Sequence, residues 1–219
     1  MRRLRHCHLP DALDSLRPMT AALLLSGGMD SISIAWWKHP DIAITIDYGQ
    51  LPAAAEITAS QAICRRLRIP HHVLQVDCHS LGSGDMAGLE PNALAPATDW
   101  WPYRNQLLIT LAAMKAVTLE VRQLWLGTVA SDASHRDGTP NFLSAMSALL
   151  AVQEGGLTVS APAIGMSTVD LVRQSGVPLE ILAWAHSCHK ADVACGACRG
   201  CNKYFEVLRE LGNELVRSG

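Results

Sequence analysis

The sequence has no apolar run approaching the roughly 18 residues that a helix needs to span a bilayer, so no membrane segment is expected. It also has little excess charge, with a formal net charge of −2. A nucleic-acid-binding enzyme would need a basic surface, so this balance favours a small-molecule substrate. The basic residues 1–6 are followed by Cys7-His8-Leu9-Pro10-Asp11 and not by an apolar stretch. No secretion signal is therefore expected, and a cytoplasmic location is the default.

Apolar residues are what the sequence has in abundance: 49% of its 219 residues are hydrophobic and only 17% are charged. A chain of this length and composition can bury a full core and form one α/β domain with a small appendage. We expect an N-terminal extension at residues 1–19, an α/β domain at residues 20–180 and a C-terminal segment at residues 181–219.

Predicted strands and helices alternate along the α/β domain. Aliphatic and β-branched runs predict strands at residues 21–25, 42–46, 71–76 and 123–126. Apolar periodicity predicts helices at residues 31–38, 52–67, 104–120 and 141–153. This alternation is typical of a parallel sheet, in which ligands bind beyond the carboxyl ends of the strands. Residues 81–101, rich in Gly, Pro, Asn and Asp, predict a long loop of the kind that serves as a lid or binding element.

A glycine-rich loop follows the first predicted strand, with the sequence Ser26-Gly27-Gly28-Met29-Asp30-Ser31. Adjacent glycines let the backbone turn tightly and direct several N–H donors at one anion, and serine hydroxyls add further donors beside a helix N-terminus. Asp30 would hold Mg²⁺ or cap the helix. The alternative to a phosphate-binding loop is an ordinary glycine turn. It is not a Walker loop, because no Lys follows Gly28 until Lys38.

Four cysteines cluster near the other end of the chain: Cys188, Cys195, Cys198 and Cys201, in the pattern C-x6-C-x2-C-x2-C. Four thiolates fit one tetrahedral Zn²⁺, and structural zinc is the favoured interpretation. An iron–sulfur cluster is the alternative, although the fourth ligand lies upstream and no Pro follows the last Cys. His186 and His189 flank the first Cys as competing ligands or as surface residues near the metal.

Two resemblances rest on these motifs. The glycine-rich loop resembles the SGGxDS loop of the PP-loop ATP pyrophosphatases, which split ATP between its α and β phosphates. The whole chain, in order, resembles the 7-cyano-7-deazaguanine synthases. The matching features are SGGMDS, Asp47-Tyr48-Gly49-Gln50, Arg104-Asn105, Asp132 after Leu126-Gly127, and Ser187-Cys188 ahead of the cysteine cluster.

This resemblance implies an adenine-nucleotide α-hydrolase-like Rossmann fold with a parallel sheet, carrying a C-terminal zinc-bearing helical segment and usually forming a homodimer. The implied enzyme is an ATP-dependent C–N ligase of queuosine biosynthesis. It activates the carboxylate of 7-carboxy-7-deazaguanine with ATP and Mg²⁺, and ammonia then displaces AMP to give the amide. A second activation removes water from the amide to give the nitrile.

The resemblance also implies a set of site residues. Asp30, Ser31, Arg104 and Asp132 are the expected catalytic residues, and the four cysteines are the expected zinc ligands. For Asp132, recognition of a purine-like amidine edge and a helix cap before Ala133 are both open. The expected nucleotide-binding residues are Leu25, Ser26, Gly27, Gly28, Met29, Asp30, Ser31, Asp47, Gln50, Arg104, Asn105 and Gly127.

Three segments depart from the pattern of the family. Tyr103 stands where the family has Gly before Arg-Asn, and residues 135–140 replace a Tyr-Pro-Asp-Cys-Arg stretch. The family also has a Lys in a Thr-Lys-x-Glu context, but the corresponding segment here, Ser167-Thr168-Val169-Asp170, has none. Arg136 or Arg173 would then have to substitute for that cation near the phosphates.

These departures leave alternatives to nitrile synthesis open. One is a divergent ligase that joins the adenylated deazaguanine carboxylate to another amine, such as one on a protein in a bacterial antiviral defence system. Another is a non-catalytic nucleotide-binding module stabilised by zinc. A thiolating PP-loop enzyme acting on tRNA is disfavoured, because it would need a reactive cysteine and a basic surface.

Overall fold

A parallel five-stranded sheet forms the centre of the computed structural model, which describes residues 20–217; the expected N-terminal extension lies outside the described residues. The strand order β3-β2-β1-β4-β5 confirms the expected Rossmann-like α/β architecture. The strands are β1 (Ala21–Leu24), β2 (Ile42–Asp47), β3 (His71–Gln75), β4 (Gln123–Leu126) and β5 (Thr158–Ser160).

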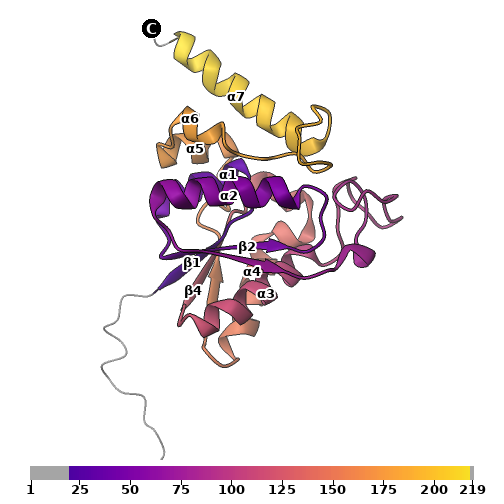
Figure 1. Ribbon diagram of the computed structural model, residues 1–219, viewed down its shortest axis with the longest axis vertical. Helices are drawn as coiled ribbons and strands as arrows, with labels where there is room; N and C mark the ends of the chain where they lie inside the picture. The colour runs from indigo at the N-terminus through magenta and orange to yellow at the C-terminus, as the bar shows by residue number, and fades with distance from the viewer. Residues whose placement is uncertain (1–19, 218–219) are drawn as a thin grey trace, which may run out of the picture.

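Helices cover both faces of this sheet (Figure 1). The α-helices are α1 (Met29–Lys38), α2 (Ala53–Leu67), α3 (Arg104–Thr118), α4 (Pro140–Ala151), α5 (Thr168–Ser175), α6 (Leu179–Leu182) and α7 (Arg199–Arg217). The short 3-10 helices are η2 (His79–Leu81), η3 (Ala130–Ser134) and η4 (Arg136–Gly138). Among the described residues, no helix is both long and apolar enough to cross a membrane.

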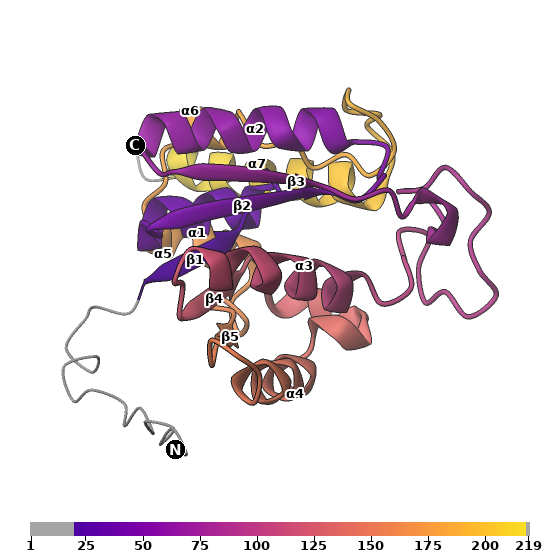
Figure 2. The same ribbon diagram turned by 60° about the horizontal axis from the view of Figure 1, so that its bottom comes forward.

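The central strand β1 is buried on both sides, and this explains its uninterrupted apolar sequence. Ala22 and Leu24 face the core formed with α3 and α4, whereas Leu23 and the following Leu25 face the core formed with α1 and α2. Figure 1 shows α3 and α4 below the sheet, with α1, α2 and the C-terminal helices above it. Figure 2 shows α4 beside β5, at the edge of the sheet opposite β3. Helix α7 joins the second core through Val207 and Leu211.

Most element boundaries lie within two residues of the expected ones. The largest omission from the expected elements is α5, whose eight residues span little more than two turns. Its cap is clear in the structure, because the Ser167 hydroxyl accepts the Asp170 N–H at 3.1 Å. Between η2 and α3, residues 82–103 form the expected long loop without further helix or strand. Trp101 anchors that loop by packing edge-on against Tyr48, with ring centroids 4.9 Å apart.

Tyr103, at the N-cap of α3, has a left-handed backbone with φ of 54°. This conformation explains a preference for Gly at the position, since a side chain there costs about 1–2 kcal/mol. The Tyr103 ring is 78% exposed and points to solvent. Tyr103, in place of the Gly of the family, therefore strains the backbone but leaves the interior of the protein unchanged.

We expect Tyr103→Gly to raise the free energy of unfolding by about 1 kcal/mol, because it removes the left-handed strain at the loss of few contacts. Tyr103→Ala is the matched control, since it keeps the strain while removing the ring. Urea unfolding of the three proteins measures the difference. Equal stabilisation by both substitutions would show that the ring, and not the backbone, is unfavourable.

Candidate active site

A cavity of about 850 Å³ opens beyond the carboxyl ends of β1, β2 and β4. It lies where the strand order reverses between β1 and β4, the usual ligand site of open α/β sheets. The loop after β1, the first residues of α3, α5 and α7, and the segment around η3 all contribute to its walls. Of the expected site residues, those lining the cavity are Leu25, Ser26, Gly28, Met29, Asp30, Ser31, Arg104, Asn105, Gly127 and Asp132.

The glycine-rich loop has a shape that only glycine permits at its centre. Gly27 has φ of +73°, and a Cβ there would collide with the carbonyl oxygen of Glu56 on α2. The Gly27 carbonyl accepts the His186 N–H at 2.9 Å, which ties the loop to the segment before the cysteines. Gly27 therefore sets the path of the loop from outside the cavity lining.

Two serine hydroxyls complete the loop. Ser31 donates to the Gly28 carbonyl at 3.0 Å, and its Oγ lies 3.2 Å from the Oγ of Ser26. Both hydroxyls line the cavity at the N-terminus of α1. Hydroxyls and helix N–H groups in this arrangement suit an anion such as a phosphate.

Asp30, in the first turn of α1, carries the densest set of polar contacts in the loop. Its Oδ1 accepts the Thr168 hydroxyl at 2.7 Å, and its Oδ2 lies 2.8 Å from Nζ of Lys203 on α7. Burial raises the pKa of Asp30, and the Lys203 ammonium opposes that shift. Thr168 thus occupies the segment in which the family has Lys, and it contributes a hydroxyl to Asp30.

Asp132, on η3, lies close to Asp30, since both carboxylates approach Lys203. Its Oδ2 accepts the Val129 N–H at 3.0 Å and so caps η3, while its Oδ1 lies 3.9 Å from Nζ of Lys203. The expected cap before Ala133 is not formed, because Asp132 is the third residue of η3 and accepts the N–H of Val129, which precedes this helix. The carboxylates of Asp30 and Asp132 both approach the ammonium group of Lys203. A pair of carboxylate oxygens of this kind also fits Mg²⁺.

Lys203 also corrects an expectation about the missing cation. Neither Arg136 nor Arg173 lines the cavity. Arg173 instead contacts Asp170 at 3.2 Å and Glu210 at 3.5 Å. Lys203 lies on α7, 173 residues after Asp30 in the sequence. No local motif could therefore have indicated that its ammonium group contacts the loop.

Arg104 and Asn105 open α3 at the opposite wall. Asn105 is fixed by its amide, which donates to the Asp137 carbonyl at 2.9 Å. The Arg104 guanidinium donates to Sδ of Met86. Arg104 lines the cavity, and its charged neighbours include Asp137, Asp99 and Glu56.

Asp47 and Gln50 lie outside the cavity lining. Asp47 accepts the Gly49 N–H at 3.1 Å and so shapes the turn after β2. The buried Gln50 accepts the Tyr48 N–H at 2.8 Å and donates to Oε2 of Glu56 at 2.8 Å. Glu56 does line the cavity, so Gln50 contributes to the site by orienting that carboxyl group.

Glu56 was not anticipated from the sequence, where it reads as an acidic residue in the first turn of a helix. Burial raises its pKa to about 7, although the Gln50 amide and Arg104 oppose the shift. The cavity therefore contains a carboxyl group that can exchange a proton near neutral pH.

A second polar cluster joins the long loop to the C-terminal segment. Asp99, only 5% exposed, lies 3.3 Å from the Arg199 guanidinium, 3.6 Å from His135 and 3.5 Å from His189. Burial would raise the pKa of Asp99, but these neighbours together hold it well below its usual range. Arg199 also donates to the Ser134 hydroxyl at 2.7 Å. The departure at residues 135–140 thus places a buried His in the wall of the cavity.

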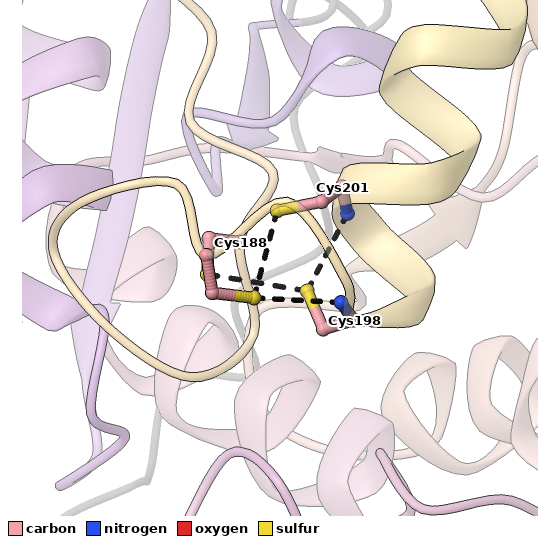
Figure 3. A group of neighbouring side chains, drawn as sticks. Cys188, Cys198 and Cys201 are labelled. Carbon is pink, nitrogen blue, oxygen red and sulfur yellow. Dashed lines mark hydrogen bonds between the residues drawn. The ribbon is translucent and has the colours of Figure 1, made fainter.

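The four cysteines form a compact site in which the ligand atoms all lie within 4.8 Å of one another. Figure 3 shows Cys188, Cys198 and Cys201 with their sulfur atoms turned together beside the first turn of α7. The backbone N–H groups of residues 189 and 201 donate to Sγ of Cys198 at 3.3 and 3.4 Å, and that of residue 198 donates to Sγ of Cys195 at 3.4 Å. Such donors stabilise thiolates, and the N–H groups of Ala197 and Cys198 lower the pKa of Cys195 to about 6.

This geometry fits a single metal ion such as Zn²⁺, with all four cysteines as ligands. The flanking histidines take other roles. His186 Nε2 lies 2.9 Å from the Ala191 carbonyl, and His189 is turned towards Asp99. The cysteines themselves lie outside the cavity lining, which indicates a structural site.

We expect Cys198→Ser to reduce the bound zinc from about one ion per chain to near zero, with poor solubility of the protein. Cys64→Ala, which alters a buried cysteine of the core outside the cluster, should leave the zinc content unchanged. Metal analysis of the purified proteins measures both. A Cys198→Ser protein that is soluble and fully metallated would contradict the assignment.

The raised pKa of Glu56 predicts a pH dependence of stability. The folded protein retains a proton that the unfolded chain releases near pH 4.5, so the free energy of unfolding falls as the pH rises towards about 7. The free energy of unfolding of Glu56→Gln, measured relative to the wild type, should therefore be higher at pH 8 than at pH 4.5. The expected difference is on the order of 1 kcal/mol after solvent screening. Urea unfolding at the two pH values tests this, with the exposed Glu180→Gln as control. An unchanged difference between wild type and Glu56→Gln at the two pH values would refute it.

Comparison with known proteins places this chain in a family. The family model of the queuosine biosynthesis protein QueC matches residues 20–212. The 7-cyano-7-deazaguanine synthase of Xanthomonas campestris pv. campestris (strain B100) is 34% identical over 205 residues, covering 83% of this chain and 89% of that protein. The 7-cyano-7-deazaguanine synthase of Desulforudis audaxviator is 30% identical over 224 residues, covering 90% of this chain and all of that protein. The chain therefore belongs to the QueC family of queuosine biosynthesis proteins.

Proposed function

We propose that this protein is an ATP-dependent enzyme of the 7-cyano-7-deazaguanine synthase type, which converts the carboxylate of 7-carboxy-7-deazaguanine to the nitrile by way of the amide. The names of its relatives support the reaction. The observation that carries the proposal is the single cavity in which the glycine-rich loop, Asp30, Asp132 and Arg104 meet. That arrangement supplies groups for phosphate, for a divalent cation and for a substrate anion.

The first step in this proposal is attack of the substrate carboxylate on the α-phosphorus of ATP, which forms an acyl adenylate and releases pyrophosphate. The N-terminus of α1 and the hydroxyls of Ser26 and Ser31 would stabilise the charge that develops on the leaving pyrophosphate. Asp30 and Asp132 would hold Mg²⁺, which lowers the repulsion between the phosphates and the approaching carboxylate.

The second step is displacement of AMP by ammonia to form the amide. The Arg104 guanidinium would bind the substrate carboxylate before activation, because its planar donors match two oxygens at once. Glu56, which shares the cavity, would accept the proton that ammonia loses as the C–N bond forms. The amide oxygen then attacks the α-phosphorus of a second ATP and releases pyrophosphate. AMP leaves with that oxygen as the nitrogen loses its two protons, and the product is the nitrile.

In this scheme Asp132 would help to hold Mg²⁺ and would not recognise the purine edge of the substrate. One of its oxygens already accepts a backbone N–H, and the other faces a cation. A bidentate pairing with an amidine would need both oxygens to face the substrate. The cap and the contact with Lys203 therefore favour a role beside Asp30.

A second candidate is the ligase that transfers the adenylated carboxylate to an amine other than ammonia, with a protein as the acceptor. It is favoured by the replaced segment at residues 135–140, which places His135 beside Asp99 and Arg199 in the wall of the cavity. Both candidates share the adenylation step and differ in the second nucleophile. The non-catalytic module is disfavoured, because the cation whose absence motivated it is supplied by Lys203.

We expect Asp30→Asn to abolish pyrophosphate release that depends on 7-carboxy-7-deazaguanine, while circular dichroism and zinc content stay unchanged. The loss should exceed about 100-fold, because the substitution removes a charge that holds both the cation and the leaving group in place. Asp170→Asn is the matched control, since Asp170 lies on α5 close to Thr168 but outside the cavity. A pyrophosphate assay with Mg²⁺ and ammonium measures all three proteins. Wild-type turnover by Asp30→Asn would rule out the proposed ATP site.

A further inference from the structure

Lys203 is the basic side chain that reaches the glycine-rich loop. Its Nζ lies 2.8 Å from Oδ2 of Asp30 and 3.9 Å from Oδ1 of Asp132. The side chain is 34% exposed and lines the cavity. One ammonium group thus faces two carboxylates at the place where the loop would receive phosphate.

The position of Lys203 is fixed by the start of α7. This helix begins at Arg199, directly after Cys198, and Cys201 is buried in its first turn. Six residues after Cys201, Val207 packs into the core beside α1 and α5. Gly200 allows the close approach, because a Cβ there would collide with the Ser187 carbonyl oxygen. The ammonium is therefore held over the loop by the cysteine cluster on one side and by core packing on the other.

The other basic residues of the cavity have different partners. The Arg199 guanidinium is engaged by Asp99, His135 and Ser134. Arg104 lies on the opposite wall, at the start of α3, where it contacts Met86. Among the described residues, the contact between a cation and the loop carboxylate Asp30 is made by Lys203 alone.

The preferred partners of Lys203 and of the two carboxylates change when ATP and Mg²⁺ bind. Without nucleotide, the one ammonium group offsets part of the charge of the two carboxylates. A divalent cation prefers carboxylate oxygens, whereas an ammonium group pairs well with a phosphate oxygen. Both cations can be satisfied if Mg²⁺ takes the carboxylates and the ammonium moves to the phosphates.

We propose that Lys203 is a phosphate-binding residue that exchanges partners during the reaction: it pairs with Asp30 and Asp132 before ATP binds, and when Mg²⁺ takes these carboxylates it binds the pyrophosphate portion of ATP. This inference rests on the proposed function. It assigns to α7, the helix that starts in the cysteine cluster, a direct part in holding the leaving group.

The exchange predicts effects of opposite sign on two ligands. Lys203→Met should bind ATP·Mg²⁺ about 10- to 100-fold more weakly, because a charge-assisted contact is lost. It should bind Mn²⁺ without nucleotide about tenfold more tightly, because the competing ammonium is gone. Calorimetry measures the first and electron paramagnetic resonance of Mn²⁺ the second, both at pH 8 on zinc-loaded protein.

Three further variants sharpen the test. Lys203→Arg should recover most of the ATP affinity, since it keeps the positive charge. Arg209→Met removes an exposed cation from the same helix and should change neither affinity. Adding Asp30→Asn to Lys203→Met should abolish the gain in Mn²⁺ affinity, because that gain depends on the Asp30 carboxylate.

The outcomes separate this inference from the proposed function. If the wild type binds ATP and Lys203→Met binds it equally well, the inference is wrong while the function stands. If Lys203→Met weakens ATP and Mn²⁺ alike, Lys203 supports the fold of the site and does not exchange partners. If the wild type binds no ATP, the proposed function is wrong, and so is the proposed role of Lys203.

Discussion

The contact between Asp30 and Lys203 joins two parts of the chain that are 173 residues apart, and the architecture of the cavity depends on it. Asp30 projects from the first turn of α1, where the loop leaves a strand buried in the centre of the sheet. Its carboxylate would repel phosphate in isolation, and the ammonium of Lys203 offsets that charge. Thr168 and Asp132 complete the arrangement from two further elements. The single positive charge of Lys203 thereby offsets part of the negative charge that Asp30 and Asp132 bring to the cavity.

The cysteine cluster acts on the cavity although it lies outside the lining. Cys198 and Cys201 flank the residues at which α7 begins, so a metal bound there would set the direction of the helix. Arg199 and Lys203 then point from adjacent turns to two parts of the cavity wall, towards Asp99 and Asp30 respectively. Asp99 belongs to the long loop, which the Tyr48–Trp101 contact anchors to the sheet. The cysteine cluster, the long loop and the glycine-rich loop are in this way mechanically connected.

Features that depend on local sequence could be predicted, and features that depend on tertiary packing could not. Alternating apolar segments indicated the parallel sheet, and the residues Ser26 to Ser31 indicated the glycine-rich turn between a strand and a helix, because both signals are contiguous. The spacing of the cysteines likewise indicated a metal site. Asp47 and Gln50 follow a strand at the correct end of the sheet, but their side chains are used by nearby backbone groups and by Glu56. Lys203, Glu56 and Asp99 acquire their roles from distant elements that packing brings together, so their local sequence carried no signal.

The measurement that tests the account most directly is mass spectrometry of the products formed from 7-carboxy-7-deazaguanine, ATP, Mg²⁺ and ammonium, with AMP and pyrophosphate assayed in the same mixture. The account predicts the nitrile, with AMP and pyrophosphate released together. Accumulation of the amide or of an adenylate without nitrile would contradict the proposed product and favour the ligase with another amine acceptor. Absence of any ATP cleavage would contradict the assignment of the cavity as an ATP site.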